Sequence, residues 1–344
     1  MEEDEKYMWR CIQLAQNGGN ATSPNPMVGA VIVYKGEIIG EGFHIHCGDW
    51  HAEVNAINSV KDEALLKYST LYVTLEPCSH FGKTPPCADL IIKKQIPRVV
   101  IGCIDPSLKV HGRGIKKLTD AGCQVEVGVL EHECRHLIRH FTRYNMDKRP
   151  YIILKWAESS NGYIGAKNQI TMISTQHTLM LMHKRRAESD AILVGTHTAI
   201  IDNPKLTVRD WYGKNPIRVV LDRNLVLPES LNLFDGAVPT LVFTTKRGVN
   251  KNNLEYIAVP EDDFSLSRLM DELVIRNIQS LLVEGGKELH QSFIDGGLWD
   301  EAFIEKSNLF IDDGVRAAQL NSCNLIEIRK FFGVFIFHYS HIES

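Results

Sequence analysis

Residues His51-Ala52-Glu53, Glu76-Pro77-Cys78 and Cys87 decide the fold and chemistry of the first half of the chain. One imidazole and two thiolates fill three positions of a tetrahedral zinc site and leave the fourth for water, which distinguishes catalytic from structural zinc. Bound zinc lowers the pKa of that water, and a carboxylate beside it can carry the proton. The pattern therefore predicts a hydrolytic Zn²⁺ site with His51, Cys78 and Cys87 as ligands and Glu53 as the catalytic residue.

The spacing of His51 and Glu53 restricts where they can lie. Positions i and i+2 are roughly 200° apart around an ideal helix, so the two side chains share a site only where a helix begins. Residues 48–50 precede the helical apolar pattern, which agrees with such a start. Between Cys78 and Cys87, one glycine and two prolines can turn the chain so that both thiols face one point. The alternative is that the cysteines are apolar core residues and His51 a surface residue.

The composition limits the partners and the compartment. The 344 residues carry 38 basic and 42 acidic side chains, a formal charge of −4, which argues against a nucleic-acid track or an anionic membrane surface. The first residues are acidic, unlike a secretory signal, and no apolar run reaches the roughly 20 residues that span a bilayer. The sequence thus predicts a cytoplasmic protein. Its remaining cysteines are expected in the core: Cys11, Cys47, Cys103, Cys123, Cys134 and Cys323.

Alternating strand and helix patterns predict two α/β domains. A polar stretch that ends in proline, residues 145–150, places the expected boundary between 1–146 and 147–344. An opening helix is expected over residues 5–18 and a second helix over 51–60. The expected strands are 27–34, 37–42, 70–75 and 99–104 in the first half, and 151–155, 191–194, 218–221, 240–243 and 280–283 in the second.

Residues 74–87 with the His51-Ala52-Glu53 triplet resemble the deaminase half of the bifunctional deaminase/reductase of riboflavin biosynthesis, which has this long interval between its cysteines. The resemblance implies a cytidine-deaminase-like three-layer α/β/α fold. It also implies a phosphoribosylated diaminohydroxypyrimidine substrate that loses a ring amine as ammonia. By the same resemblance the substrate-binding residues of this half are Asn25, His44, His80 and Lys83. A cation such as Lys83 suits a phosphorylated ligand.

The second half carries weaker local signals. Residues 185–195 run from a basic helix end into an apolar strand, and a polar loop, 196–209, follows at the carboxyl end where ligands of open α/β sheets collect. Residues 280–289 place Gly285-Gly286 between a strand and a helix, which lets backbone N–H groups approach a phosphate. These blocks, in this order, resemble the reductase half of the same family, a dihydrofolate-reductase-like α/β domain that uses NADPH to reduce a ribosyl side chain to ribityl.

The resemblance assigns roles in this second half by position. The residues expected to face NADPH are Ala157, Thr198, Asp202, Gly285 and Gly286. The residues expected to hold the substrate are Arg186, Leu206, Arg209 and Glu284, among which guanidinium groups suit a sugar phosphate. Self-association into a homo-oligomer is expected from the family likeness alone.

Two segments depart from the family pattern. Residues 159–162 read Ser-Ser-Asn-Gly where the family usually has Ser-Leu-Asp-Gly, and Met172 stands where an aromatic residue is usual. These departures leave open a second reading, in which the C-terminal half is a non-catalytic binding or assembly module. A deaminase of bases in tRNA or DNA would need a basic surface and aromatic stacking positions. A purely structural zinc protein would need a closed site rather than three ligands beside a glutamate.

Overall fold

The structure, a computed structural model, describes residues 3–79, 85–107, 110–167 and 170–342. The chain divides into two compact units, Met1–Lys148 and Arg149–Ser344. Helix α6 (Arg139–Asp147) is the last element of the first unit, and Lys148 ends it in a left-handed backbone conformation with φ of 55°. None of the described helices is long and apolar enough to cross a membrane.

The first unit is built on one five-stranded sheet in the order β2-β1-β3-β4-β5. Its strands are β1 (Gly29–Tyr34), β2 (Glu37–Phe43), β3 (Thr70–Leu75), β4 (Arg98–Cys103) and β5 (Gln124–Val127). The predicted hairpin of β1 and β2 is confirmed: it is antiparallel, and both turn residues, Lys35 and Gly36, have positive φ, as a tight hairpin turn requires. Strands β3, β4 and β5 are parallel.

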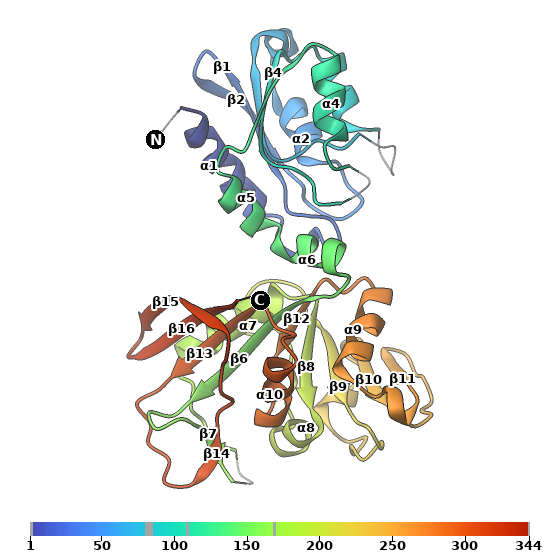
Figure 1. Cartoon of the computed structure of the whole chain (residues 1–344), viewed down its shortest axis with the longest axis vertical. Helices are drawn as coiled ribbons and strands as arrows, with labels where there is room; N and C mark the ends of the chain where they lie inside the picture. The colour runs from blue at the N-terminus through green and yellow to red at the C-terminus, as the bar shows by residue number, and fades with distance from the viewer. Residues whose placement is uncertain (1–2, 80–84, 108–109, 168–169, 343–344) are drawn as a thin grey trace. The chain divides into compact units, whose positions relative to one another are not determined.

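Helices cover both faces of this sheet (Figure 1). One face carries α1 (Glu3–Gln16) and α5 (Glu131–Leu137), and the other carries α2 (Ala52–Ser59), α3 (Cys87–Lys93) and α4 (Arg113–Asp120). The alternation along β1 sets the two cores, since Val31 and Val33 pack against α1 while Ala30 and Ile32 pack against α2. The predicted three-layer α/β/α fold is confirmed.

The second unit contains a nine-stranded sheet in the order β11-β10-β9-β8-β12-β6-β13-β16-β15 (Figure 1). The parallel strands are β6 (Tyr151–Glu158), β8 (Ala191–Gly195), β9 (Ile217–Leu221), β10 (Thr240–Thr244), β11 (Leu254–Ala258), β12 (Ser280–Val283) and β13 (Glu301–Lys306). The antiparallel edge consists of β15 (Cys323–Phe331) and β16 (Val334–His341). A small separate sheet pairs β7 (Tyr163–Ala166) with β14 (Gly314–Arg316). The helices are α7 (Gln176–Ala187), α8 (Thr196–Asp202), α9 (Leu266–Ile275) and α10 (Lys287–Asp295).

The parallel arrangement brings the polar loops of the second unit together. Helices α8 and α10 follow β8 and β12, which are neighbours in the sheet, so both helices begin at the same edge. Of the cysteines expected in the core, Cys11, Cys103 and Cys134 are buried and Cys123 and Cys323 are half-buried. Cys47 is a correction: it is exposed, because it lies in the turn that follows β2.

Candidate active sites

Three predicted ligands converge in the first unit. The potential ligand atoms of His51, Cys78 and Cys87 all lie within 4.8 Å of one another. His51 Nδ1 is 3.6 Å from the sulfur of Cys78 and 3.3 Å from that of Cys87. One imidazole nitrogen and two sulfurs at this spacing fit Zn²⁺, for which imidazole and thiolate are preferred ligands. These three residues would hold the ion and leave one tetrahedral position for water.

The local backbone explains why the ligands meet. His51 is the extended residue that precedes α2, so it lies at the helix start that its spacing from Glu53 requires. Cys78 follows the buried end of β3, and Cys87 is the first residue of α3. The backbone N–H of Cys87 donates to the Cys78 sulfur at 3.3 Å, which stabilises the thiolate form. Hydrogen bonds from Cys87 and His51 lower the pKa of Cys78.

Glu53 lies in the first turn of α2 and is only 3% exposed. Burial raises the pKa of Glu53 to about 7, and the nearby Cys78 adds to the rise while His51 opposes it. A carboxyl group whose pKa is near neutrality can both accept and return a proton, as general acid–base catalysis requires. The buried position of Glu53 in the first turn of α2, directly after the ligand His51, therefore suits the predicted proton transfer.

Two predicted substrate residues contact each other beside the zinc ligands. The amide nitrogen of Asn25 donates to His44 Nε2 at 3.0 Å, and His44 Nδ1 donates to the carbonyl oxygen of Trp50, also at 3.0 Å. The rings of His44 and His51 meet edge to face with centroids 5.4 Å apart. Because His44 uses the Asn25 nitrogen, the Asn25 oxygen is the atom we expect to accept a hydrogen bond from a ligand. His80 and Lys83 lie outside the described residues.

Two of the predicted cofactor residues of the second unit, Thr198 and Gly286, meet near the starts of α8 and α10. A Cβ atom at Gly286, where φ is 74°, would lie 3.1 Å from Thr198 Oγ1, so the two residues are in contact range. A Cβ atom at Gly285 would lie 3.0 Å from Val194 Cβ on β8. Asp202 ends α8, and Ala157 lies on β6. Glycine at 285 and 286 therefore permits close packing of the two loops at this sheet edge.

Two of the predicted substrate residues of this unit, Arg186 and Glu284, form a buried ion pair. Arg186 Nε donates to Glu284 Oε1 at 2.9 Å and Arg186 Nη2 to Oε2 at 2.6 Å, while Nη1 reaches the carbonyl oxygen of Thr207 at 3.1 Å. This paired geometry commits the Arg186 guanidinium to the protein. Arg209 is exposed, and its Nη1 donates to the Thr207 hydroxyl at 2.9 Å. Leu206 is 2% exposed in the core, so a role toward substrate falls to its backbone.

Comparison with known proteins identifies the family. Residues 1–103 match the cytidine and deoxycytidylate deaminase zinc-binding region, and residues 150–305 match the RibD C-terminal domain. The riboflavin biosynthesis protein RibD of Aquifex aeolicus is 38% identical over 335 residues, which cover 96% of this chain and 94% of that protein. The chain belongs to the RibD family. RibD of Bacillus amyloliquefaciens is 40% identical over 308 residues, covering 87% of this chain and 82% of that protein.

Solved RibD structures share the whole architecture. The diaminohydroxyphosphoribosylaminopyrimidine deaminase/5-amino-6-(5-phosphoribosylamino)uracil reductase of Thermotoga maritima superposes with a TM-score of 0.91 at 35% identity, covering 98% of this chain and 99% of that one. RibD of Acinetobacter baumannii gives 0.90 at 30% identity and covers 99% of each chain. As a RibD protein, the chain is a bifunctional deaminase and reductase of riboflavin biosynthesis that acts on a small pyrimidine, with zinc and NADPH as its cofactors.

Glu76 is a residue of the RibD deaminase site whose role the sequence did not reveal. It is 3% exposed and follows β3. Its two carboxylate oxygens accept backbone N–H groups from Gly112 at 2.9 Å and Gly114 at 2.8 Å, and from Asp105 and Ile115 at 3.3 Å. A Cβ at Gly114 would lie 2.0 Å from the Pro77 carbonyl oxygen, so glycine is required there. Glu76 thus ties the segment before Cys78 to the start of α4.

Two ionisable side chains of the reductase half, Lys155 and His183, were also not singled out by the sequence. Burial lowers the pKa of Lys155, while the nearby carboxylates of Glu284 and Glu305 oppose the shift. The sequence feature that could have pointed to Lys155 is its place within the apolar run at residues 151–156, where a lysine is unusual. His183, 1% exposed on α7, accepts the Arg209 backbone N–H at Nδ1 (3.2 Å), and its Nε2 lies 3.2 Å from Asp210. No sequence pattern links His183 to Arg209, because α7 and the loop come together only in the fold.

The departures from the RibD pattern have distinct structural settings. The amide of Asn161 donates to the Ile311 carbonyl oxygen at 2.8 Å and accepts from the Ile311 N–H at 3.2 Å. Its oxygen also accepts from Ser159 Oγ at 2.8 Å. An aspartate could not make the first of these bonds, so asparagine suits this turn. Met172 is 71% exposed.

Proposed function

We propose that this chain catalyses two successive steps on one phosphoribosylated pyrimidine. The first is hydrolytic deamination of 2,5-diamino-6-(5-phosphoribosylamino)pyrimidin-4-one, in which water adds to the ring carbon and ammonia leaves. The second is reduction of the ribosyl side chain to ribityl by NADPH. The observation that carries the proposal is the buried Glu53 beside the converging His51, Cys78 and Cys87, in one chain with a reductase domain.

The deamination assigns each residue a separate task. Zinc, when bound by the three ligands, supplies a water of lowered pKa. Glu53 takes the first proton from that water and passes it to the ring nitrogen, then takes the second from the hydroxyl added to the ring carbon and passes it to the amine, so that the C–N bond breaks, the carbonyl forms and ammonia leaves. His44 holds the Asn25 amide, whose oxygen then accepts an N–H of the pyrimidine. We also assign His80 and Lys83 to the substrate, Lys83 toward its phosphate, by family likeness.

For the reduction, NADPH supplies the hydride and the protein positions the sugar. We assign Ala157, Thr198, Asp202, Gly285 and Gly286 to the cofactor. The ribosyl ring must open before its anomeric carbon can accept a hydride, and opening requires a proton at the ring oxygen. We assign that proton exchange to Lys155, whose pKa burial lowers, with the carboxylate of Glu284 near it.

The substrate phosphate of this step needs a cation that the protein has not already paired. Arg209 meets this need better than Arg186, because Arg186 is committed to Glu284 and to the Thr207 carbonyl. Arg186 then acts by orienting Glu284, and Leu206 by its backbone. The match of residues 150–305 to the RibD C-terminal domain supports reduction of the deaminated product rather than a non-catalytic second domain.

A coupled assay tests the proposal. The aminated substrate is supplied with NADPH, and ammonia release and NADPH absorbance are recorded together, with and without a zinc chelator. We expect ammonia first and NADPH loss after it, both abolished by chelation. When the deaminated pyrimidine is supplied instead, NADPH loss should resist the chelator. Ammonia without any NADPH consumption would contradict the second step, and NADPH consumption without ammonia would contradict the first.

The remaining expectations concern partners and compartment. We propose a cytoplasmic homo-oligomer that binds neither nucleic acid nor membrane; the formal charge of −4 supports the exclusion of nucleic acid. Sedimentation equilibrium at micromolar protein tests the assembly, and a lone monomer would contradict it. Binding to single-stranded RNA at physiological salt would contradict the exclusion of nucleic acid.

A further inference from the structure

The segment after α8 has an unusual backbone. Residues 203–209 form neither helix nor strand, yet two of them hold left-handed backbone angles without being glycine: Asn203 has a φ of 41° and Leu206 a φ of 52°. Such conformations carry an energetic cost for residues with a Cβ atom and persist where surrounding contacts hold them. The contacts of this segment therefore identify what fixes its shape.

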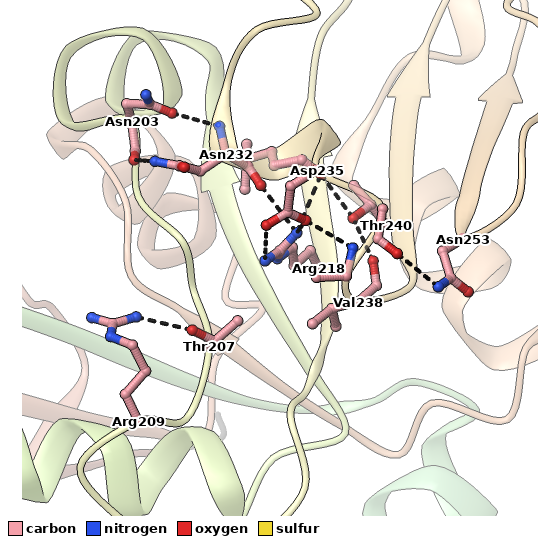
Figure 2. A network of polar contacts seen from close by, with 12 residues as sticks. Asn203, Thr207, Arg209, Arg218, Asn232, Asp235, Val238, Thr240 and Asn253 are labelled. Carbon is pink, nitrogen blue, oxygen red and sulfur yellow. Dashed lines mark hydrogen bonds and ion pairs between the residues drawn. The ribbon is translucent and has the colours of Figure 1, made fainter.

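Asn203 is held from two sides by one partner. The backbone N–H of Asn232 donates to Asn203 Oδ1 at 2.7 Å, and Asn232 Nδ2 donates to the Asn203 carbonyl oxygen, also at 2.7 Å (Figure 2). Both the side chain and the backbone of Asn203 are thus used. Two bonds from one residue determine orientation as well as position, which a single hydrogen bond does not.

Asn232 is itself anchored to the sheet. Arg218, a fully buried residue of β9, donates from Nη1 to the Asn232 carbonyl oxygen at 3.1 Å and to Asp235 Oδ1 at 2.7 Å. Thr240 Oγ1 on β10 donates to the Leu233 carbonyl oxygen at 3.0 Å. Figure 2 shows these residues as one network that connects β9 and β10 to Asn203. The Arg218 guanidinium, fully buried and paired with the partly exposed Asp235, gives Asn232 a fixed partner on the sheet.

The far end of the segment is tied to different elements. Thr207 accepts from Arg186 through its carbonyl oxygen, Val208 donates its N–H to Asn215 Oδ1 at 2.7 Å, and the Arg209 N–H donates to His183. Asn203 therefore stands at the junction between Asp202, on the cofactor side, and Leu206 and Arg209, on the substrate side. The junction sets the distance and angle between the two groups of residues.

We propose that Asn203 is a positioning residue of the reductase site, held by Asn232 and Arg218 so that Asp202 and Arg209 keep a fixed relation to each other. The inference rests on the proposed reductase function, because it assigns Asn203 an effect on that reaction. Asn203 acts through the backbone and touches neither the reacting atoms nor the phosphate. A displacement of about 1 Å at the junction would misplace the substrate relative to the cofactor and could lower the rate of reduction by up to about 100-fold.

Two substitutions of matched chemistry test the proposal. Asn203→Gly keeps the left-handed backbone, which glycine tolerates, and removes the side-chain oxygen that accepts the Asn232 N–H, leaving the backbone contact to Asn232 Nδ2. Asn253 is the control: it also has positive φ (59°), and its amide donates to the Gly236 carbonyl oxygen at 2.9 Å in the same network. Asn253→Gly thus removes an amide contact without touching residues 203–209. Asn203→Asp is the rescue variant, because its carboxylate still accepts from the Asn232 N–H and tolerates left-handed φ.

Reduction is measured on the deaminated pyrimidine with NADPH, and ammonia release from the aminated substrate is the internal control in each full-length variant. We expect Asn203→Gly to lower reductase kcat/KM by about tenfold or more, with a higher KM for substrate, while Asn203→Asp and Asn253→Gly stay within about twofold of the parent. Ammonia release stays unchanged in all three. Hydrogen exchange should show loss of protection at the amides of Val208 and Arg209 in Asn203→Gly alone.

The outcomes separate this inference from the proposed function. A parent chain that oxidises no NADPH refutes the reductase function, whereas the exchange measurement still tests whether Asn203 holds the segment. Reductase activity of Asn203→Gly within twofold of the parent, or an equal loss in Asn253→Gly, overturns the inference. Should Asn203→Gly fold poorly, Asn232→Ala removes the Nδ2 donor without altering the segment itself, and unchanged reduction in that variant also overturns it.

Discussion

The carboxylate of Glu76 accepts a hydrogen bond from the backbone N–H of Gly114 at 2.8 Å. We predict that Glu76→Gln destabilises the first unit by about 1–3 kcal/mol, because an amide NH₂ would face backbone donors that now meet a carboxylate oxygen. The displaced Pro77-Cys78 backbone should also weaken zinc retention. Thermal unfolding and zinc content after dialysis against a weak chelator measure the two effects.

A surface carboxylate provides the control for Glu76. The Glu126 side chain is 46% exposed and pairs with Arg98, so Glu126→Gln removes a charge in the same unit without a buried contact. It should change stability by less than about 1 kcal/mol and leave zinc content at the parent value. Equal zinc content and equal melting temperature in both variants would refute the role of Glu76.

His183 provides a prediction for the reductase half. His183→Gln should raise the reductase KM for the deaminated pyrimidine about tenfold, because the Arg209 backbone loses its buried acceptor and the guanidinium moves from its position. Steady-state NADPH oxidation measures this, and ammonia release should not change. The matched variant is His177→Gln, at an exposed position of the same helix α7. Equal KM values in the two variants would contradict the prediction.

Because His290 is buried, we predict that the free energy of unfolding of the second unit depends on pH. Burial lowers the pKa of His290 to about 4, below its ordinary value of 6.5, so the folded protein holds the neutral ring while the unfolded chain takes up a proton. A lowered histidine pKa stabilises the fold above pH 6.5, and this contribution is lost as the pH falls toward 4. The loss amounts to roughly 3 kcal/mol. His183, whose pKa burial also lowers, adds in the same direction.

Urea unfolding of the second unit measures this dependence. Tryptophan fluorescence reports that unit alone when Trp9→Phe and Trp50→Phe are present in every sample, since Trp156, Trp211 and Trp299 remain. The free energy of unfolding of the His290→Gln variant should fall less steeply between pH 6.5 and 4 than that of the parent. Parallel curves for the two proteins would show that His290 does not titrate as predicted.

The features that the sequence predicts are those set by residues close together in the chain. The strand at 70–75 and the zinc ligands were predictable because apolar runs and ligand spacing are local patterns. The contact of His183 with Arg209 was not, because it joins a helix to a loop across the fold. The exposed Cys47 was misplaced because residue type alone predicts burial only on average. The pairing of Arg186 with Glu284 was also not predictable, because the two residues are 98 positions apart and meet only in the fold.

At position 161 the family usually has aspartate, and the effect of that residue on this fold can be tested. We predict that Asn161→Asp lowers the free energy of unfolding of the second unit by about 1–3 kcal/mol, because the Ile311 carbonyl oxygen loses its donor and meets a carboxylate instead. The same fluorescence measurement at neutral pH gives the value. A variant as stable as the parent would mean that the turn at 159–162 accepts either side chain.

The most direct test of two sites acting in succession uses Glu53→Gln, which keeps the ligands and removes the proton carrier. The variant should retain zinc, release no measurable ammonia from the aminated substrate, and oxidise NADPH at the parent rate when the deaminated pyrimidine is supplied. Ammonia release at the parent rate would contradict the role of Glu53 in the first site. Loss of NADPH oxidation on the deaminated substrate, in a folded variant with full zinc content, would contradict the separation of the two sites.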